Sequence, residues 1–341
     1  MDFSPGFHLL LGPNAQGKTN ILEAIYLIAT LRSFRGVGSA QMVRHGHKGY
    51  FVGAEIEGQS SSMVKIYWSA RERNLTLNSQ PVRRLADYLG ILRAVVFCSE
   101  DLQLVKGPAS RRRRFVDLLL TQTHPAYLGM LRRYAQALRA RNALLKQRVL
   151  NEAALAGFTS ELESAGSEII RMRAKLIPEF VPFAVAAYLK ITGAREEFSV
   201  SYQPAVKADF AVELAQSRSR ERTMRMTLVG PHRDEVVIAV DGKSALQFAS
   251  EGQKRSAVIA LKMAQAEYLS HLHGSPPVLL IDDVMGELDR GRRAGLLPLL
   301  ERAHACRGQV FMTATDENWP RELGRELKRW EVSSGELRTA L

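Results

Sequence analysis

The sequence predicts an α/β protein in which a long helical block separates two segments that contain β-strands. Short apolar runs with the composition of buried parallel strands occur at 7–11, 93–97, 277–281 and 309–313. Between about 110 and 190, apolar residues instead recur three and four positions apart and glycine is sparse, which is typical of helices. We expect the two outer segments to form one domain and the helical block to be inserted into it.

Further helices and strands are expected around these runs. The segments 20–31 and 250–269 have helical spacing. Alternating or β-branched residues predict strands at 50–56, 63–68, 75–77, 197–202 and 235–240. Within the helical block we expect breaks at Pro125, Gly157 and Pro178, because proline and glycine disfavour the helix interior.

These elements divide the chain into three segments. Residues 1–107 hold the N-terminal part of the α/β domain, 108–220 form the helical arm, and 221–341 hold the C-terminal part. The two ends are assigned to one domain because each supplies half of the chemical motifs described below.

Composition excludes several classes of protein. Of the 341 residues, 46% are hydrophobic and 24% are charged, which is ordinary for a globular protein and unlike a disordered or collagen-like chain. The two cysteines, Cys98 and Cys306, are too few for a disulfide framework. The longest apolar stretch, around 180–189, is about half of what a membrane span needs. We therefore expect a soluble cytoplasmic protein without a signal peptide.

The positive charge is concentrated in one region. The chain carries 47 Lys and Arg against 35 Asp and Glu, a net charge of +12. Between 102 and 150 there are eleven basic residues, opposed only by Asp117. A local excess of this size indicates a polyanionic partner. Nucleic acid is favoured over an anionic membrane.

A phosphate-binding loop is the strongest motif. The pattern Gly-x-x-x-x-Gly-Lys-Thr is complete and is formed by Gly12, Pro13, Asn14, Ala15, Gln16, Gly17, Lys18 and Thr19. Its glycines let backbone N–H groups face a phosphate, and the N-terminus of the following helix adds a positive dipole end. In such a loop Lys18 reaches the β- and γ-phosphates, and Thr19 supplies a hydroxyl to Mg²⁺.

Two adjacent carboxylates complete this chemistry. Asp282 and Asp283 directly follow the apolar run at 277–281. A P-loop enzyme needs a second contact to Mg²⁺, usually an Asp at the end of a buried strand, and Asp282 is suited to it. Asp283 is placed to orient the attacking water as a general base.

Three further motifs resemble those of ABC-type ATPases. They are a signature motif at Ser250, Gly252 and Gln253, a D-loop at Glu287, Leu288 and Asp289, and a switch position at Thr315 and Asp316. Ser250 is also suited to cap the helix that it precedes. In that superfamily the signature of one subunit closes over the nucleotide held by the other. The resemblance therefore implies an ATP-dependent homodimer.

Nearly the whole chain resembles the RecF family. The matching motifs, besides the loop, the signature and the aspartate pair, are Glu23–Tyr26, Arg32–Arg35, Glu100–Leu102, Val105–Gly107, Arg111–Arg114 and Gly230–Asp234. The resemblance implies a P-loop ATPase head of the ABC or SMC type with an inserted helical second lobe. The segments 1–107 and 221–341 would then be the two parts of the head.

The resemblance also implies a function. Family members bind single-stranded, gapped or duplex DNA with ATP and Mg²⁺, and slow DNA-dependent ATP hydrolysis serves as the release switch. With RecO and RecR they load RecA in recombinational repair, replication and the SOS response. Carried onto this sequence, Asp283 and Lys18 are catalytic, Thr19 and Asp282 hold the metal, and the loop contacts the nucleotide together with Ser250, Gly252, Gln253 and Thr315.

Two features depart from the family pattern. Members usually carry an additional strand and an Asn-Phe-Arg-type segment before the P-loop strand, whereas only eleven residues precede Gly12 here. Either the chain begins inside its gene or one edge of the sheet is absent. Ser99 stands where the family has proline in a Ser-Pro-Glu-Asp-Leu segment.

Candidate DNA contacts are the basic residues at the start of the helical block, namely Lys106, Arg111, Arg112, Arg113 and Arg114. Aromatic residues are not interleaved with this run, so phosphate contacts are expected to dominate over base stacking. The remaining alternatives are a transporter subunit, a nuclease with an ATPase head, and a passive basic scaffold. The basic helical block has no role in a transporter subunit, and a nuclease would need a third carboxylate cluster, which is not visible. The intact motifs at 18–19 and 282–283 disfavour a passive scaffold.

Overall fold

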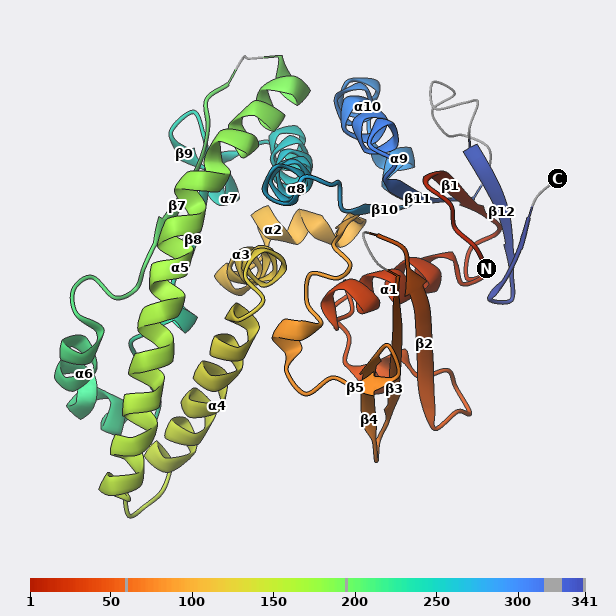
Figure 1. The fold of residues 1–341 in the computed structure, drawn as a ribbon. Coiled ribbons are helices and arrows are strands. Elements are labelled where there is room, and N and C mark those ends of the chain that lie inside the picture. Colours follow the sequence, from red (N-terminus) through yellow and green to blue (C-terminus); the bar gives the residue numbers. More distant parts are fainter. Residues whose placement is uncertain (59–60, 194–195, 316–326, 340–341) are drawn as a thin grey trace. The chain divides into compact units, whose positions relative to one another are not determined.

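The computed structural model describes residues 1–58, 61–193, 196–315 and 327–339 (Figure 1). The chain divides into two compact units. Unit 1 comprises Met1–Leu102, Phe183–Glu196 and Arg255–Leu341, and unit 2 comprises Gln103–Pro182 and Glu197–Lys254. Residues 221–254, which we placed in the C-terminal part of the head, therefore group with the helical segment in unit 2.

A largely parallel sheet forms the centre of unit 1. Its described strands lie in the order β13-β12-β1-β11-β10-β6. Their bounds are β1 Gly6–Leu11, β6 Ala94–Phe97, β10 Val278–Asp282, β11 Gln309–Ala314, β12 Leu327–Ser333 and β13 Glu336–Thr339. Strand β1 pairs in parallel with both β11 and β12, and β10 pairs in parallel with β11 and β6. The carboxyl ends of β1, β10 and β11 therefore meet at one edge of the sheet.

Helices cover both faces of the central strands, which explains why β1, β6, β10 and β11 are mostly apolar and buried, unlike β12 and β13. Helix α1 (Lys18–Thr30) and helix α10 (Arg290–Ala305) lie on opposite sides of β10 and β11 (Figure 1). Leu22 of α1 and Leu296 of α10 are fully buried, as is Leu280 between them. Each such side chain contributes about 2 kcal/mol through burial. The strands expected at 7–11, 93–97, 277–281 and 309–313 are thus confirmed.

A second, antiparallel sheet also belongs to unit 1. Its described strands follow each other as β2 (Gly49–Ile56), β3 (Ser62–Ser69), β4 (Arg73–Leu77) and β5 (Gln80–Pro81). A turn joins β4 to β5, where Asn78 and Ser79 both have positive φ angles, as a tight hairpin requires. Val64 and Ile66 are buried on one face of this sheet, whereas Lys65 and Tyr67, which alternate with them in β3, are exposed on the other face.

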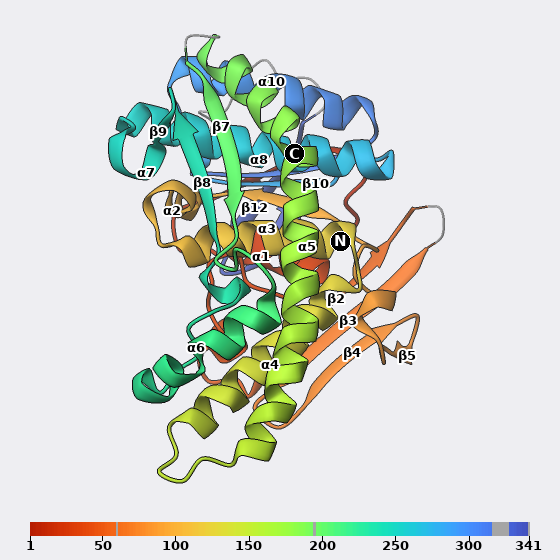
Figure 2. The same cartoon turned by 90° about the vertical axis from the view of Figure 1, so that its left-hand side faces the viewer.

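Unit 2 is mainly helical. It contains α2 Gln103–Lys106, α3 Ala109–Thr123, α4 Tyr127–Leu145, most of α5 Glu152–Thr192, α6 Phe210–Met224 and α7 Ala245–Phe248. Its strands β7 (Phe198–Gln203), β8 (Glu235–Val240) and β9 (Lys243–Ser244) pair antiparallel, with β7 and β8 side by side in Figure 2. Helix α8 (Glu251–His273) begins in unit 2 and continues into unit 1. In the described ranges, every helix is too short or too polar to cross a bilayer.

The helical block breaks in fewer places than expected. The break near Pro125 is confirmed, since it separates α3 from α4. The breaks at Gly157 and Pro178 are wrong, because α5 is a single helix through both positions and through Pro182. Proline removes one backbone hydrogen bond and costs about 3 kcal/mol in a helix interior. The buried side chains around Pro178, such as Phe180 at 1% exposure, offset that cost by packing.

Candidate nucleotide-binding site

The loop from Gly12 to Gly17 joins the end of β1 to the start of α1. Gly12 has a φ of 154° and Gly17 a φ of 104°, both in the region that favours glycine. At Gly12 a side chain is also excluded by space, because a Cβ would lie 2.4 Å from the carbonyl oxygen of Val332. The two glycines of the motif are therefore required by the backbone path itself.

Lys18 is the first residue of α1 and its side chain folds back over the loop. Its Nζ donates to the carbonyl oxygens of Gly12 at 2.5 Å and Pro13 at 3.0 Å. The side chain is buried, with 7% of the residue exposed. A buried ammonium beside a helix N-terminus is an anion site, since both attract negative charge.

Thr19 meets the end of β10. Its Oγ1 donates to Oδ1 of Asp282 at 2.9 Å, across 263 positions of sequence. Thr313, paired with Asp282 in the sheet, donates to the same Oδ1 at 3.0 Å. Burial raises the pKa of Asp282, and the hydrogen bonds from the two threonines partly oppose this shift.

This donor set fits Mg²⁺. A hydroxyl and a carboxylate are the hard oxygen ligands that Mg²⁺ uses, and the ion usually takes only one or two protein ligands beside substrate phosphates and water. Within the described ranges, no group of three or more His, Cys, Asp or Glu side chains could hold a metal. The protein would therefore contribute Thr19 and Asp282 and leave the remaining positions to the ligand.

Asp283 follows with a left-handed backbone (φ 55°) and an exposed side chain. Its N–H donates to Oγ1 of Thr313 at 2.9 Å, so Thr313 holds both aspartates in place. Sequence reasoning missed Thr313, and its signal was a hydroxyl residue at the end of the strand next to β10. Thr315 is exposed just beyond β11, and Asp316 lies outside the described residues.

A C-terminal hairpin braces the loop, which the sequence did not predict. The turn between β12 and β13 donates two backbone N–H groups to Gln16, from Ser334 to the side-chain Oε1 at 2.7 Å and from Gly335 to the carbonyl oxygen at 2.8 Å. A Cβ on Gly17 would lie 3.2 Å from Cα of Gly335. The loop is thus held from the side of β12 as well as by β1.

The signature residues lie at the start of α8, in unit 2. The N–H of Gln253 donates to Oγ of Ser250 at 3.2 Å, and the N–H of Ser250 donates to Oε1 of Gln253 at 2.7 Å. This reciprocal pair is a capping box, so Ser250 is a helix cap as expected. Gly252 lies in the first turn of the helix. The assignment of these residues to a nucleotide stays a prediction.

The basic residues of α3 are largely engaged within unit 2. Arg112 is buried against Glu235, with Nε 2.8 Å from Oε1. Arg113 donates to the carbonyl oxygen of Asp234 at 2.7 Å. Lys106 pairs with Glu251 at 2.5 Å, and Arg111 is exposed. Contact of these residues and of Arg114 with DNA stays a prediction, and Lys106 and Arg111 are the exposed members of the set.

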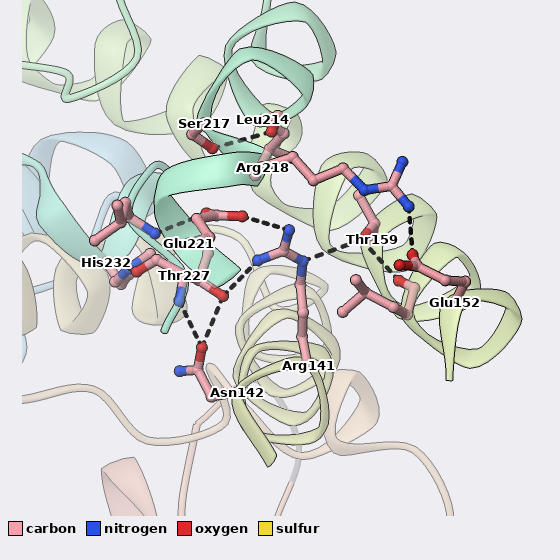
Figure 3. Close-up of polar contacts among 12 residues, drawn as sticks. Arg141, Asn142, Glu152, Thr159, Leu214, Ser217, Arg218, Glu221, Thr227 and His232 are labelled. Atoms are coloured by element: carbon pink, nitrogen blue, oxygen red, sulfur yellow. Dashed lines mark hydrogen bonds and ion pairs between the residues drawn. The ribbon is translucent and has the colours of Figure 1, made fainter. Parts of the chain in front are cut away.

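Buried charge continues along α4 (Figure 3). Arg141 donates to Glu221 Oε2 at 2.6 Å, Thr227 Oγ1 at 2.8 Å and Thr159 Oγ1 at 3.0 Å. Asn142 accepts from both the N–H and the hydroxyl of Thr227. The excess charge between 102 and 150 is therefore partly structural, because some of its arginines tie the elements of unit 2 together.

Comparison with known proteins places the chain in a family. The model described as "RecF/RecN/SMC N terminal domain" matches residues 1–332. A protein of Synechococcus sp. (strain JA-3-3Ab) named "DNA replication and repair protein RecF" is 39% identical over 325 residues, covering 90% of this chain and 84% of that protein. A protein of the same name from Lactobacillus delbrueckii subsp. bulgaricus is 35% identical, covering 99% and 92%.

Solved structures agree with this assignment. One described as the recombination mediator protein RecF with ATP in the RecFOR pathway has a TM-score of 0.90 and 26% identity, covering 100% of this chain and 93% of that one. An Smc head domain from Pyrococcus furiosus, with a TM-score of 0.54 and 14% identity, shares the fold. The predicted α/β head of the ABC or SMC type is thus confirmed, and the chain belongs to the RecF family.

Proposed function

We propose that this protein is an ATP-dependent DNA-binding switch of replication and recombinational repair. The observation that carries the proposal is the joining of Lys18, Thr19 and Asp282 at one edge of the sheet, from segments far apart in the sequence. The proposal is supported by relatives that are named for DNA replication and repair, and by a similar solved structure whose description includes ATP. The protein would act in the cytoplasm.

The positions of the residues support the roles proposed for them. The N–H groups of the loop and the ammonium of Lys18 bind the phosphates, which replace the carbonyl oxygens that Lys18 contacts. Thr19 and Asp282 would hold Mg²⁺, which would neutralise part of the phosphate charge when bound. Asp283 would orient the attacking water, and Thr315, just beyond β11, would contact the γ-phosphate.

Closure would use a second copy of the chain. Ser250, Gly252 and Gln253 of one copy would contact the nucleotide held by the other, so that the γ-phosphate favours the closed dimer. A ligand shifts such an equilibrium only through its differential contacts with the two states, and hydrolysis removes those contacts. The closed dimer would hold single-stranded or gapped DNA and help to load a recombinase, in concert with the RecO and RecR proteins.

DNA phosphates would meet the exposed basic side chains rather than the buried ones. Arg111, Arg132, Arg139 and Arg148 are exposed, whereas Arg141 is committed to Glu221. A binding site of this kind gives a steep negative dependence of affinity on salt.

The test is fluorescence-anisotropy binding to a gapped DNA without nucleotide, with ATP and with ADP. The expected result is tight binding only with ATP, and its loss in Lys18→Ala. Binding that is independent of nucleotide and unchanged in Lys18→Ala would overturn the proposal, because the ATP site would then not control DNA.

A further inference from the structure

The outer face of the sheet formed by β2, β3 and β4 carries two exposed aromatic side chains. Phe51 is 62% exposed and Tyr67 is 38% exposed. They are direct partners in the register of β2 and β3, so both project from the same face. The strands lie side by side in Figure 1. Val64 and Ile66, on the opposite face, are buried.

Gly53 shapes the surface around Phe51. A Cβ at Gly53 would lie 3.1 Å from Cζ and 3.2 Å from Cε1 of Phe51, so the ring lies over this glycine along the sheet. Lys65 is the register partner of Gly53 and is exposed. The ring of Phe51 therefore lies over the residue directly opposite Lys65 on the neighbouring strand.

The surrounding charge is positive. Residues 44–84 contain seven Lys and Arg against three Asp and Glu. Arg71 lies in the turn between β3 and β4, whereas Arg73 is the register partner of Trp68 and projects from the opposite face. Across the described ranges, Lys65 and Arg71 form no ion pair. This differs from α3 and α4, where several basic side chains have internal carboxylate partners.

We propose that this face binds single-stranded DNA, with neighbouring bases stacked on Phe51 and Tyr67 and phosphates at Lys65 and Arg71. Directly opposite residues on antiparallel strands are about 5 Å apart, a spacing that lets two rings serve consecutive bases. Every base has a π-face, so such stacking is tolerant of sequence. A duplex keeps its base faces inside the stack and gains only the phosphate contacts.

This inference rests on the proposed function and adds to it the surface that would bind the single strand. It also modifies the expectation that base stacking contributes little. That expectation considered aromatic residues within the basic run at 102–150, whereas the sheet brings together aromatic and basic residues from a separate part of the chain.

The experiment compares the wild type with the double variant Phe51→Leu/Tyr67→Leu, which keeps apolar side chains but removes both rings. The probes are a labelled 20-nucleotide single strand and a labelled 20-base-pair duplex, each measured with ATP present. Loss of stacking at each base weakens binding by about five- to a hundredfold. We expect at least a fivefold weaker affinity for the single strand and an unchanged affinity for the duplex and for ATP.

Two further variants sharpen this test. Phe158→Leu is the matched control, since Phe158 is 37% exposed on α5 in unit 2, and single-strand binding should not change. Lys65→Ala should weaken single-strand binding and reduce the slope of log affinity against log salt by about 0.7. A thermal melt of each variant, matching the wild type, shows that the sheet is intact.

The outcomes separate this inference from the proposed function. If the double variant binds the single strand as the wild type does, the stacking surface is refuted while ATP-dependent binding of gapped DNA can still hold. If ATP has no effect but the double variant loses single-strand binding, the switch is refuted and the surface stands. A double variant that changes only the oligomeric state would assign this face to a second copy of the chain and overturn the proposal.

Discussion

Removing the arginine at the centre of unit 2 should destabilise that unit strongly. The side chains of Arg141 and Glu221 are 2% and 1% exposed, and their charged atoms are 2.6 Å apart. In Arg141→Met the apolar stem is kept, but Glu221 loses its cationic partner and retains the backbone N–H of Leu228 at 2.8 Å. Thr227 and Thr159 lose their guanidinium donors as well.

The magnitude follows from burial. Breaking a buried ion pair by removing one partner costs about 3–5 kcal/mol, because the other charge stays desolvated. The matched control is Arg133→Met on the same helix, where Arg133 and Glu161 are 55% and 40% exposed. An exposed pair contributes at most about 1 kcal/mol. Replacing both Arg141 and Glu221 by methionine should recover much of the loss, since no buried charge remains.

The assay is hydrogen exchange of backbone amides in peptides from α4 and α6, measured at increasing urea concentrations. This readout reports on unit 2 alone, whereas a global melt of a chain with two units need not be two-state. Arg141→Met should lower the opening free energy of these peptides by about 3 kcal/mol or more. A loss within 1 kcal/mol of that in Arg133→Met would refute the reasoning.

Three further predictions concern the loop and unit 2. Gln16→Met removes the acceptor for Ser334 N–H and should weaken ATP binding about three- to tenfold by calorimetry, whereas Ser334→Ala keeps that N–H and should change nothing. Gly12→Ala places a Cβ 2.4 Å from a carbonyl oxygen and should abolish detectable ATP binding in the same assay. Burial lowers the pKa of His232 to about 4. Because the unfolded state binds the proton more tightly, stability is full above pH 6.5 and falls by up to about 3 kcal/mol as pH drops to 4; in urea titrations His232→Gln should lose this dependence.

The elements of unit 1 that form the nucleotide site were predictable because their signals are local. An apolar run followed by the P-loop pattern specifies a strand, a turn and a helix without knowledge of the rest of the chain. Asp282 was found the same way, from an apolar run that ends in a carboxylate. The contact between Asp282 and Thr19 agrees with the expectation that both residues hold Mg²⁺, and it is made although β11 lies between β1 and β10.

What the sequence could not show depends on pairing between distant segments. The hairpin of β12 and β13 that holds Gln16 is separated from it by more than 300 positions. No pattern in either segment indicates that the two are in contact. Arg112 resembled its neighbours in sequence, but its burial against Glu235 is set by the packing of α3 on β8. Pro178 failed as a helix breaker because tertiary packing offsets a local cost.

The central claim is that ATP closes a dimer of this protein. Sedimentation velocity measures the mass of the particle directly, without DNA, in the absence of nucleotide, with ATP and with ADP. The account predicts a monomer without nucleotide and with ADP, a dimer with ATP, and a monomer under all three conditions for Lys18→Ala. A mass that does not respond to ATP, or a dimer that Lys18→Ala forms equally well, would contradict it.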